Sequence, residues 1–370
     1  MNIAFWGSSL VSAYWNGAAT YYRGLLKALA KRGHRVTFYE PDAFGRQQHR
    51  DMAAPSWAEV VVYRPEADLS GLLEQSAAAD LVVKASGIGV LDEFLCYALL
   101  SGRRGGGTVI YWDVDAPATL AALDAGEHPV LREAVGDFDA VFTYGGGPPV
   151  AAAYLQRGAR QVRAIYNAVD PETHFPVPAV EAYRADATLL ANRLPDREAR
   201  LRSYFLDVAA AQPGYRFLLG GNGWSRQDVS SNVGLLGHVA PQDHNALNCS
   251  ARLVLNVNRE DMARVGYSPA TRIFEAAGAG ACIVSDAWEG IDWFLEPGAE
   301  ILLAHDGAEV ARWLCSVEPD QAQEIGRRAR LRVLDQHTYD HRALSVEQAL
   351  ASLQQPAAAE DGRQQRTTIS

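Results

Sequence analysis

The chain has 370 residues, a length that accommodates two domains of ordinary size. Hydrophobic residues make up 48% and charged residues 21%, which is typical of a folded globular protein and argues against a disordered or fibrous chain. The net charge of −10 disfavours unspecific binding to nucleic acid or to an anionic membrane surface.

Cysteine spacing and the first residues indicate a cytoplasmic protein. The four cysteines are far apart and form no C-x-x-C or Cys/His cluster, which argues against a disulfide scaffold or a structural zinc site. No basic region followed by a long apolar stretch opens the chain, so we expect no signal peptide. No apolar run approaches the ~18 residues that span a bilayer. We therefore expect a soluble, cytoplasmic protein.

Strand and helix patterns alternate through the first part of the chain. Strands are expected near Asn2–Trp6, His34–Tyr39, Glu59–Tyr63, Asp80–Ala85, Thr108–Trp112, Ala140–Tyr144 and Gln161–Tyr166. Helical patterns between them include Ala18–Lys31, Leu91–Leu100 and Pro148–Arg157. Short crossovers between strands predict an α/β fold with a parallel, doubly wound sheet.

A second alternating series follows the proline-rich segment Asn167–Pro178, which we interpret as an interdomain connection. Its strands are expected near Ala187–Ala191, Arg216–Leu219, Val233–Leu236, Leu253–Asn256, Ala281–Ser285 and Ile301–Ala304. Its helices are expected near Glu198–Ala211, Gln242–Cys249, Pro269–Gly278, Ala308–Cys315, Glu318–Gln336 and Tyr339–Leu353. Residues 354–370 are polar and aperiodic, which predicts a disordered tail. Two such halves place a ligand in the crevice between their strand ends.

The strongest chemical signal is the segment Gly266–Ala281. Ser268 is expected to cap a helix whose first turn contains Pro269, so that the free N–H groups around Ala270 and Thr271 point outward. Such a helix start binds anions, and a diphosphate is the obvious one. Arg272 can add a charge-assisted contact, and Glu275 can accept two hydrogen bonds from a ribose diol. The alternative is a structural helix whose Arg272 and Glu275 form a surface pair.

Several segments together resemble the GT-B glycosyltransferases, and in particular their CgeB-like (spore maturation protein-like) branch. The resemblance rests on Ser268–Gly280 with Ile283–Asp286, on Leu29–Val36, on Tyr111–Leu120, and on the glycine loop Tyr144–Gly147. It implies two Rossmann-like domains facing a central cleft, residues 1–168 and 169–337, with a C-terminal helix at about 338–353 completing the first. It also implies a nucleotide-sugar donor held mainly by the second domain. Many relatives have an acid at the position of Tyr267, so this sequence departs from their paired-glutamate motif.

Arginine must supply any positive side chains of the second domain, because the only lysines are Lys27, Lys31 and Lys84. Arg193 is the preferred cleft residue because it directly follows a strand, whereas Arg197 is expected on the helix surface. A general bias of the sequence toward arginine explains the absence of lysine from the second domain as well as a binding role does. Further candidate donor contacts are Gly7, Ser8, Asn16 and Gly17 in the first domain, and Gly221, Asn222, Gly223, His238, Val239, Asn258 and Arg259 in the second.

Asp113 and Asp115 form a D-x-D at the end of a strand. In GT-A enzymes such a pair holds a metal, but a GT-B enzyme uses helix N–H groups and arginines instead, so we expect no metal. The pair would then face the acceptor, where one carboxylate orients or deprotonates its hydroxyl group. The alternative is that Asp115 is simply a helix N-cap. Asp113, Asp115, Arg193 and Arg272 are accordingly the candidate catalytic residues.

These observations predict a glycosyltransferase (a hexosyltransferase type) that moves a sugar from a nucleoside-diphosphate sugar to a hydroxyl-bearing acceptor without a cofactor. Only the resemblance favours retention at the sugar carbon, and either UDP or GDP fits as the nucleotide. A sugar-nucleotide epimerase of the same frame and a non-catalytic nucleotide-binding scaffold or sensor remain alternatives. A nicotinamide dehydrogenase is less compatible, because no G-x-G-x-x-G follows the first strand.

Overall fold

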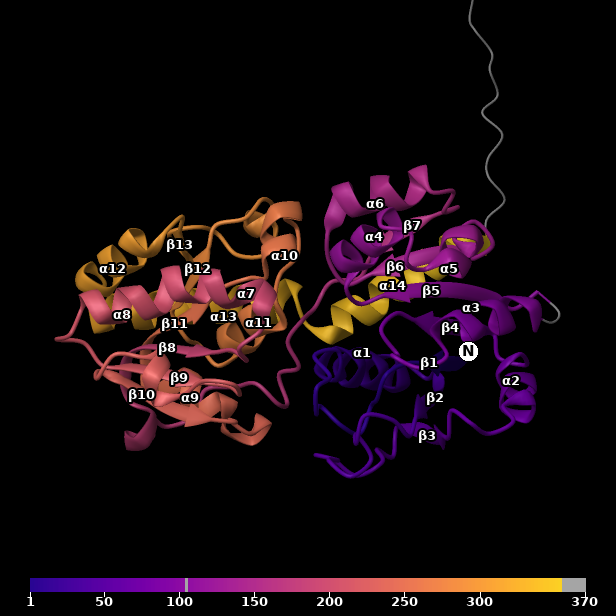
Figure 1. Ribbon diagram of the computed structural model, residues 1–370, viewed down its shortest axis with the longest axis horizontal. Coiled ribbons are helices and arrows are strands. Elements are labelled where there is room, and N and C mark those ends of the chain that lie inside the picture. Colours follow the sequence, from indigo (N-terminus) through magenta and orange to yellow (C-terminus); the bar gives the residue numbers. More distant parts are fainter. Residues whose placement is uncertain (104–105, 355–370) are drawn as a thin grey trace, which may run out of the picture.

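The computed structural model describes residues 1–103 and 106–354. Within them the chain forms two all-parallel sheets, each with helices on both faces (Figure 1). The predicted α/β class, with two Rossmann-like domains, is therefore confirmed. No helix in the described ranges is long and apolar enough to span a membrane.

The first domain contains a seven-stranded sheet in the order β3-β2-β1-β4-β5-β6-β7. Its strands are β1 (Asn2–Trp6), β2 (Arg35–Pro41), β3 (Ala58–Tyr63), β4 (Leu81–Ala85), β5 (Thr108–Asp113), β6 (Ala140–Thr143) and β7 (Val162–Ala164). Its helices are α1 (Ala19–Lys31), α2 (Ser70–Ser76), α3 (Asp92–Ser101), α4 (Ala116–Asp124), α5 (Pro129–Ala134) and α6 (Gly147–Gln156). The central strands β1, β4, β5 and β6 are buried along almost their whole length, since helices cover both sides of the sheet.

The second domain contains a six-stranded sheet in the order β10-β9-β8-β11-β12-β13. Its strands are β8 (Ala185–Leu190), β9 (Phe217–Gly220), β10 (Val233–Gly237), β11 (Ala251–Asn256), β12 (Ile283–Asp286) and β13 (Leu302–Ala304). Its helices are α7 (Pro195–Leu201), α8 (Asp207–Ala211), α9 (His244–Ser250), α10 (Glu260–Val265), α11 (Thr271–Gly278), α12 (Gly307–Ser316) and α13 (Pro319–Gln336). The helix expected over Glu198–Ala211 begins earlier and contains a π-helical turn at Arg202–Leu206, between α7 and α8.

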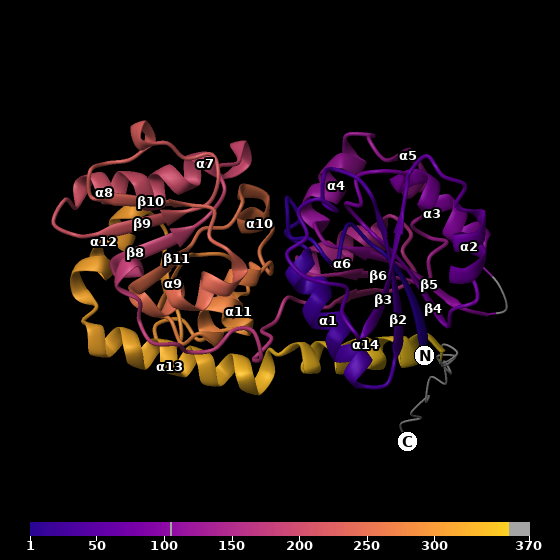
Figure 2. The same ribbon diagram turned by 90° about the horizontal axis from the view of Figure 1, so that it is seen from below.

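The last helix, α14 (Tyr339–Gln354), returns to the first domain and packs on α1. Figure 2 shows α13 along one side of the second domain and α14 continuing along the first. Gly24 of α1 permits the close approach, because a Cβ there would lie 2.1 Å from the Tyr339 ring. Residue 354 ends α14, and the remainder of the predicted tail lies outside the described residues.

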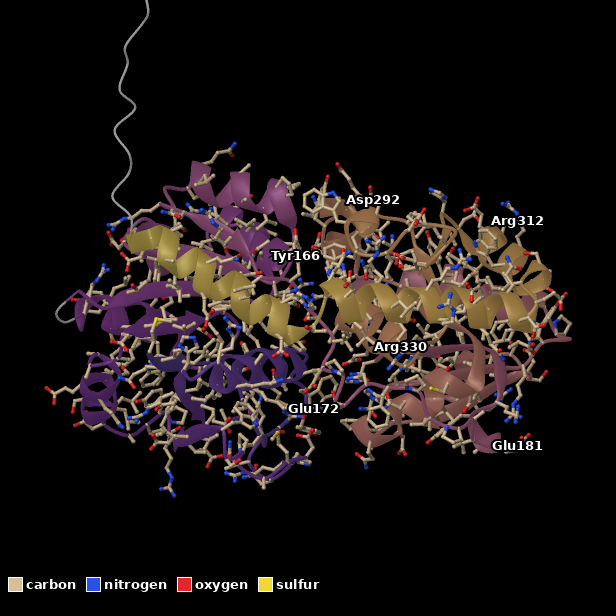
Figure 3. The ribbon with its side chains drawn as sticks, turned by 180° about the vertical axis from the view of Figure 1, so that it is seen from behind. Tyr166, Glu172, Glu181, Asp292, Arg312 and Arg330 are labelled. Atoms are coloured by element: carbon tan, nitrogen blue, oxygen red, sulfur yellow. The ribbon has the colours of Figure 1, made fainter. Side chains whose placement is uncertain are left out.

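The chain crosses between the domains twice, and the two crossings are joined. Val169 N–H donates to His337 O at 2.9 Å, and Tyr339 N–H donates to Val169 O at 3.1 Å. Arg342 is buried beside them and donates to the carbonyl groups of Tyr166 and Asn167. Figure 3 shows this crossing from behind, where Tyr166 lies close to the junction of α13 and α14. The predicted domain limits fall at this double crossing.

Candidate functional site

The carboxyl ends of the two sheets meet through the glycine loop after β6. Gly146 N–H donates to the carbonyl oxygen of Tyr267 at 2.8 Å, across the domain boundary. A Cβ at Gly147 would lie 2.6 Å from the Tyr267 Cβ, so glycine is required for this approach. Tyr267 itself has a φ of 47°, in the left-handed region, which is a strained backbone conformation for a tyrosine. The loop therefore brings the segment before α11 against the first domain.

An ion-pair chain also joins the domains at this edge. Arg259, which follows β11, donates through Nη1 to Asp115 Oδ2 at 2.8 Å and through Nε to Asp196 Oδ2 at 2.5 Å. Burial raises the pKa of Asp115, and Arg259 opposes that rise. Asp115 is the N-cap residue of α4, although its side chain makes no capping hydrogen bond. The predicted candidates Asp115 and Arg259 thus lie together, as partners of each other.

Asp113 does not face the acceptor, contrary to the prediction. Its side chain is fully buried, and Oδ1 accepts hydrogen bonds from Ser86 Oγ, Thr119 Oγ1 and the backbone N–H of Asp115. Oδ2 accepts a hydrogen bond from the Tyr154 hydroxyl at 2.5 Å. With four protein donors on its two oxygens, this carboxylate holds the end of β5 against its neighbours. It has no open position for an acceptor hydroxyl.

Helix α11 begins at Thr271 with Ala270 as its N-cap residue and has no capping side chain. Ser268 was expected to be the cap, and that prediction is wrong because the helix starts two residues later than predicted. Pro269 likewise precedes the first turn. Asn167, from the interdomain connection, holds this start: it accepts from Thr271 Oγ1 at 3.0 Å and donates to Pro269 O at 3.3 Å. The Ser268 hydroxyl is buried and has no hydrogen-bond partner in the described ranges.

Two arginines at this helix start have no side-chain hydrogen bond or ion pair among residues 1–103 and 106–354. Arg272 is in the first turn of α11, and burial lowers its pKa to about 10. Arg197 is in α7; burial lowers its pKa, and its Nε is a buried donor without a partner. The two are close enough for Arg197 to depress the pKa of Arg272. Two neighbouring guanidinium groups that make no ion pair, one of them in the first turn of a helix, form an anion-binding arrangement.

Arg193 is not available for that role, contrary to the prediction. Its guanidinium group makes two hydrogen bonds to Glu198, at 2.9 and 2.7 Å, and one to Asp228 at 3.1 Å. It also lies over the ring of Trp224. The preference for Arg193 over Arg197 is therefore reversed by the structure: the strand-end residue is paired within its own domain, and the helix residue is unpaired.

Glu275, one turn along α11, lies in a partly buried cluster with two histidines. His174 Nε2 is 3.7 Å from Glu275 Oε1, and these two side chains are only 10% and 12% exposed. A ring nitrogen of His244 completes a set in which each ligand atom lies within 4.8 Å of the others. Burial lowers the pKa of His244, Glu275 opposes that effect, and Arg272 adds to it. Glu275 thus lies close enough to Arg272 to act on it electrostatically.

The first-domain candidates are paired within their own loop. Ser8 Oγ donates to Asn16 Oδ1 at 2.9 Å, and Asn16 Nδ2 donates to the carbonyl groups of Ser9 and Ser12. Gly7 is buried, with its N–H bonded to Tyr39 O, whereas Gly17 is exposed. These buried polar groups shape the turn after β1, which does not support the predicted donor contacts for Gly7, Ser8 and Asn16.

The remaining second-domain candidates lie around the ends of β9, β10 and β11. Gly221 N–H donates to Gly237 O at 2.6 Å, and Asn222 and Gly223 are exposed. His238 is exposed, while Val239 is buried and its backbone accepts a hydrogen bond from His244. Asn258 is buried, donating from its side chain to Ser268 O at 3.3 Å and from its backbone to Asp286. Asn258 therefore links the segment before α11 to the end of β12 through these two hydrogen bonds.

Sequence reasoning missed three residues: Arg197, Asn167 and His174. Arg197 was placed on a helix surface, although it is the first arginine of a helix that follows a strand end. Asn167 and His174 lie in the segment interpreted only as a connection. Their polar side chains among prolines were the available signal, but only the fold shows that the connection passes the start of α11.

Comparison with known proteins agrees with this geometry. Residues 197–348 match the family model described as glycosyl transferase-like. That range begins at Arg197 and includes Arg272, Glu275 and most of α14. No curated protein matches the sequence.

Solved structures with the same fold are GT-B glycosyltransferases. HepE of Anabaena in complex with UDP and glucose is 16% identical, with a TM-score of 0.66 over 95% of this chain and 100% of that one. Sucrose-phosphate synthase of Thermosynechococcus elongatus is 18% identical, with a TM-score of 0.67 over 95% of this chain and 99% of that one. An α-glucosyltransferase bound to UDP-glucose and DNA is 11% identical, with a TM-score of 0.68 over 96% of this chain and 99% of that one. The chain therefore has the GT-B architecture.

Proposed function

We propose that this protein is a glycosyltransferase that transfers a hexose from a nucleoside-diphosphate sugar to a hydroxyl-bearing acceptor. One observation carries the proposal: Arg197 and Arg272 lie unpaired at the start of α11, where the two domains meet. A partly buried guanidinium group without an ion pair is costly, and a bound diphosphate lowers that cost. The family match over residues 197–348 supports the same conclusion.

The proposed chemistry is stabilisation of the leaving group. As the bond between sugar and diphosphate breaks, negative charge grows on the diphosphate oxygens. The positive groups at the start of α11 are already in place before the reaction: they are Arg197, Arg272 and the free N–H groups of the first turn. They therefore stabilise that charge without reorganising. Glu275 accepts hydrogen bonds from the ribose hydroxyls and fixes the nucleotide along the helix.

The proposal includes UDP as the nucleotide, since solved GT-B structures of the same fold are described as complexes with UDP or UDP-glucose. It also includes a reaction that needs no metal, because two arginines and a helix start supply the positive charge. Asp113 supports this point: its oxygens are occupied by four protein donors, so the D-x-D is not arranged to ligate a metal beside the diphosphate. The proposal also includes retention of configuration and membership of the CgeB-like branch, which rest on the sequence resemblance. A cytoplasmic location completes it, on the basis of the cysteine spacing.

The test is a panel of UDP-sugars, scored first by thermal shift and then by UDP release with and without hydroxyl-bearing acceptors. We expect one donor to give slow release that an acceptor accelerates and that EDTA leaves unchanged. Accumulation of an epimerised sugar nucleotide without acceptor would instead identify an epimerase. Tight donor binding without turnover across a broad acceptor panel would identify a sensor.

Glu275→Ala supplies a residue-level test of the donor site. The variant removes a charge-assisted hydrogen bond that contributes about 1.5–3 kcal/mol, so UDP affinity should fall roughly ten- to hundredfold. Calorimetric titration of UDP measures this directly. Glu309→Ala is a matched control, because Glu309 is a carboxylate of the same domain that pairs with the exposed His305. Equal UDP affinity for Glu275→Ala and the wild type would contradict the assignment.

A further inference from the structure

The cluster of His174, His244 and Glu275 presents lone pairs to one another. The carbonyl oxygen of Asp170 accepts hydrogen bonds from the backbone N–H groups of Thr173 and His174 and from the Thr173 hydroxyl, the last at 3.1 Å. The same hydroxyl oxygen lies 2.9 Å from His174 Nδ1, where it can accept from an Nδ1–H group. In the neutral ring this fixes the tautomer and leaves Nε2 as an acceptor, facing the Glu275 carboxylate at 3.7 Å.

His244 adds a third acceptor. Its ring bonds to the backbone of Val239, and burial keeps the imidazole neutral by lowering its pKa. The neutral ring therefore has one nitrogen that donates to the Val239 carbonyl group and one that can accept. Three groups rich in lone pairs thus converge within 4.8 Å, and they call for a ligand that supplies hydrogen-bond donors or positive charge.

The neighbouring charges decide between these two kinds of ligand. Arg272 acts electrostatically on both Glu275 and His244, and its positive charge opposes a divalent cation at the cluster. Arg272 and Arg197 instead favour an anion beside it. A nucleoside diphosphate has both features, since its ribose hydroxyls, which are hydrogen-bond donors, follow the diphosphate after a single methylene group.

We propose that His174 binds the ribose of the donor, with its Nε2 accepting a hydrogen bond from one hydroxyl of the 2′,3′-diol while Glu275 accepts from the other. This proposal rests on the proposed function and adds to it a selectivity for ribonucleotides over their deoxy forms. Thr173 acts as the positioning residue, because its hydroxyl fixes the tautomer of His174. Asn245 donates to Thr173 O at 2.8 Å and so ties this turn to α9.

The experiment titrates UDP, 2′-deoxy-UDP and 3′-deoxy-UDP into the full-length protein by calorimetry. For the wild type, the analogue without the hydroxyl that faces His174 should bind about three- to tenfold more weakly than UDP, and the analogue without the hydroxyl that faces the Glu275 carboxylate roughly ten- to hundredfold. His174→Ala should lose that discrimination for one of the two hydroxyls and keep it for the other. His174→Gln, whose side-chain oxygen can reach the place of Nε2, should restore part of it. His305→Ala, at an exposed histidine of the same domain, should behave like the wild type.

Three results would overturn the proposal. One is equal affinity of the wild-type protein for UDP and both deoxy analogues. Another is a His174→Ala variant, with an unchanged melting temperature, that weakens all three nucleotides by the same factor. The third is binding of Co²⁺ alone, with a visible absorption band that His174→Ala abolishes, because the cluster would then be a metal site. Failure of the wild type to bind UDP at all would overturn the proposed function together with this inference.

Discussion

Polar groups lie at the carboxyl ends of both sheets, but they are partnered differently. In the first domain, the buried Asp113 accepts four hydrogen bonds from its own domain. In the second domain, Arg197 and Arg272 are partly buried without a side-chain hydrogen bond or ion pair in the described ranges, and Arg197 Nε is a buried donor without a partner. A buried charge therefore indicates a ligand site only where the protein leaves that charge unmatched.

The same contrast separates two arginines that are four positions apart. Arg193 directly follows β8 and is neutralised by Glu198 and Asp228. Arg197, one helical turn later, has no such partner. The position of an arginine after a strand is thus a weaker guide to function than its hydrogen bonds and ion pairs within the protein.

Asp113→Ala tests whether this carboxylate is structural. The change leaves the Ser86, Thr119 and Tyr154 hydroxyls and the Asp115 N–H without their acceptor, so the free energy of unfolding should fall by about 3 kcal/mol or more. Urea denaturation at pH 7 measures the loss. Asp115→Ala is the matched control: its carboxylate is 36% exposed, so the loss there should stay within about 1 kcal/mol. Similar losses of unfolding free energy in both variants would contradict the structural role of Asp113.

His337 should make the free energy of unfolding depend on pH. It is buried at the crossing between α13 and α14, where Arg342 donates to its Nδ1 at 2.9 Å. Burial, reinforced by the charges of Arg342, Arg332 and His341, lowers its pKa to about 3. Since the unfolded chain takes up this proton near the ordinary pKa of about 6.5, the stability contributed by neutral His337 is complete above that pH. It is lost as the pH falls from about 6.5 toward 3, by at most about 1.4 kcal/mol per pH unit.

The measurement compares unfolding free energies of the wild type and His337→Asn at pH 7.5 and pH 5. The asparagine oxygen can still accept from Arg342 but does not titrate. Between these pH values the wild type should lose about 2 kcal/mol more than the variant, as expected for a proton excluded over about 1.5 pH units. Parallel losses in the two proteins would show that His337 takes up a proton without cost to the fold.

Arg259→Ala tests whether an arginine that is already paired contributes to donor binding. Its side chain and that of Asp115 are 35% and 36% exposed, so removing the pair should change the unfolding free energy by at most about 1 kcal/mol. UDP affinity, measured by calorimetry, should change less than about threefold, because its hydrogen bonds already go to Asp115 and Asp196. A tenfold loss would return Arg259 to the donor site predicted from the sequence.

The fold could be predicted because its signals are local. Alternating apolar strands and amphipathic helices predict two doubly wound sheets without knowledge of distant contacts. Arg272 and Glu275 could also be found, since both lie on one helix start whose chemistry depends on spacing. The choice between Arg193 and Arg197 could not be predicted, because it depends on Asp228, which is brought to Arg193 only by the fold.

The same limit explains the error at Asp113 and the omission of His174. The carboxylate of Asp113 is occupied by Ser86 and Tyr154, which lie 27 and 41 positions away in the chain. His174 meets Glu275 because the connection between the domains passes α11. Pairings over such separations leave no periodic trace in the sequence.

The central claim is that the two unpaired arginines, and not the paired one, hold the diphosphate. The most direct measurement is calorimetric titration of UDP into Arg197→Ala and, as its matched control, Arg193→Ala. Arg197→Ala should lower UDP affinity roughly ten- to hundredfold, whereas Arg193→Ala should change it less than about threefold in the folded protein. The reverse order, with Arg193→Ala losing UDP affinity and Arg197→Ala retaining it, would contradict the assignment of the diphosphate to Arg197 and Arg272.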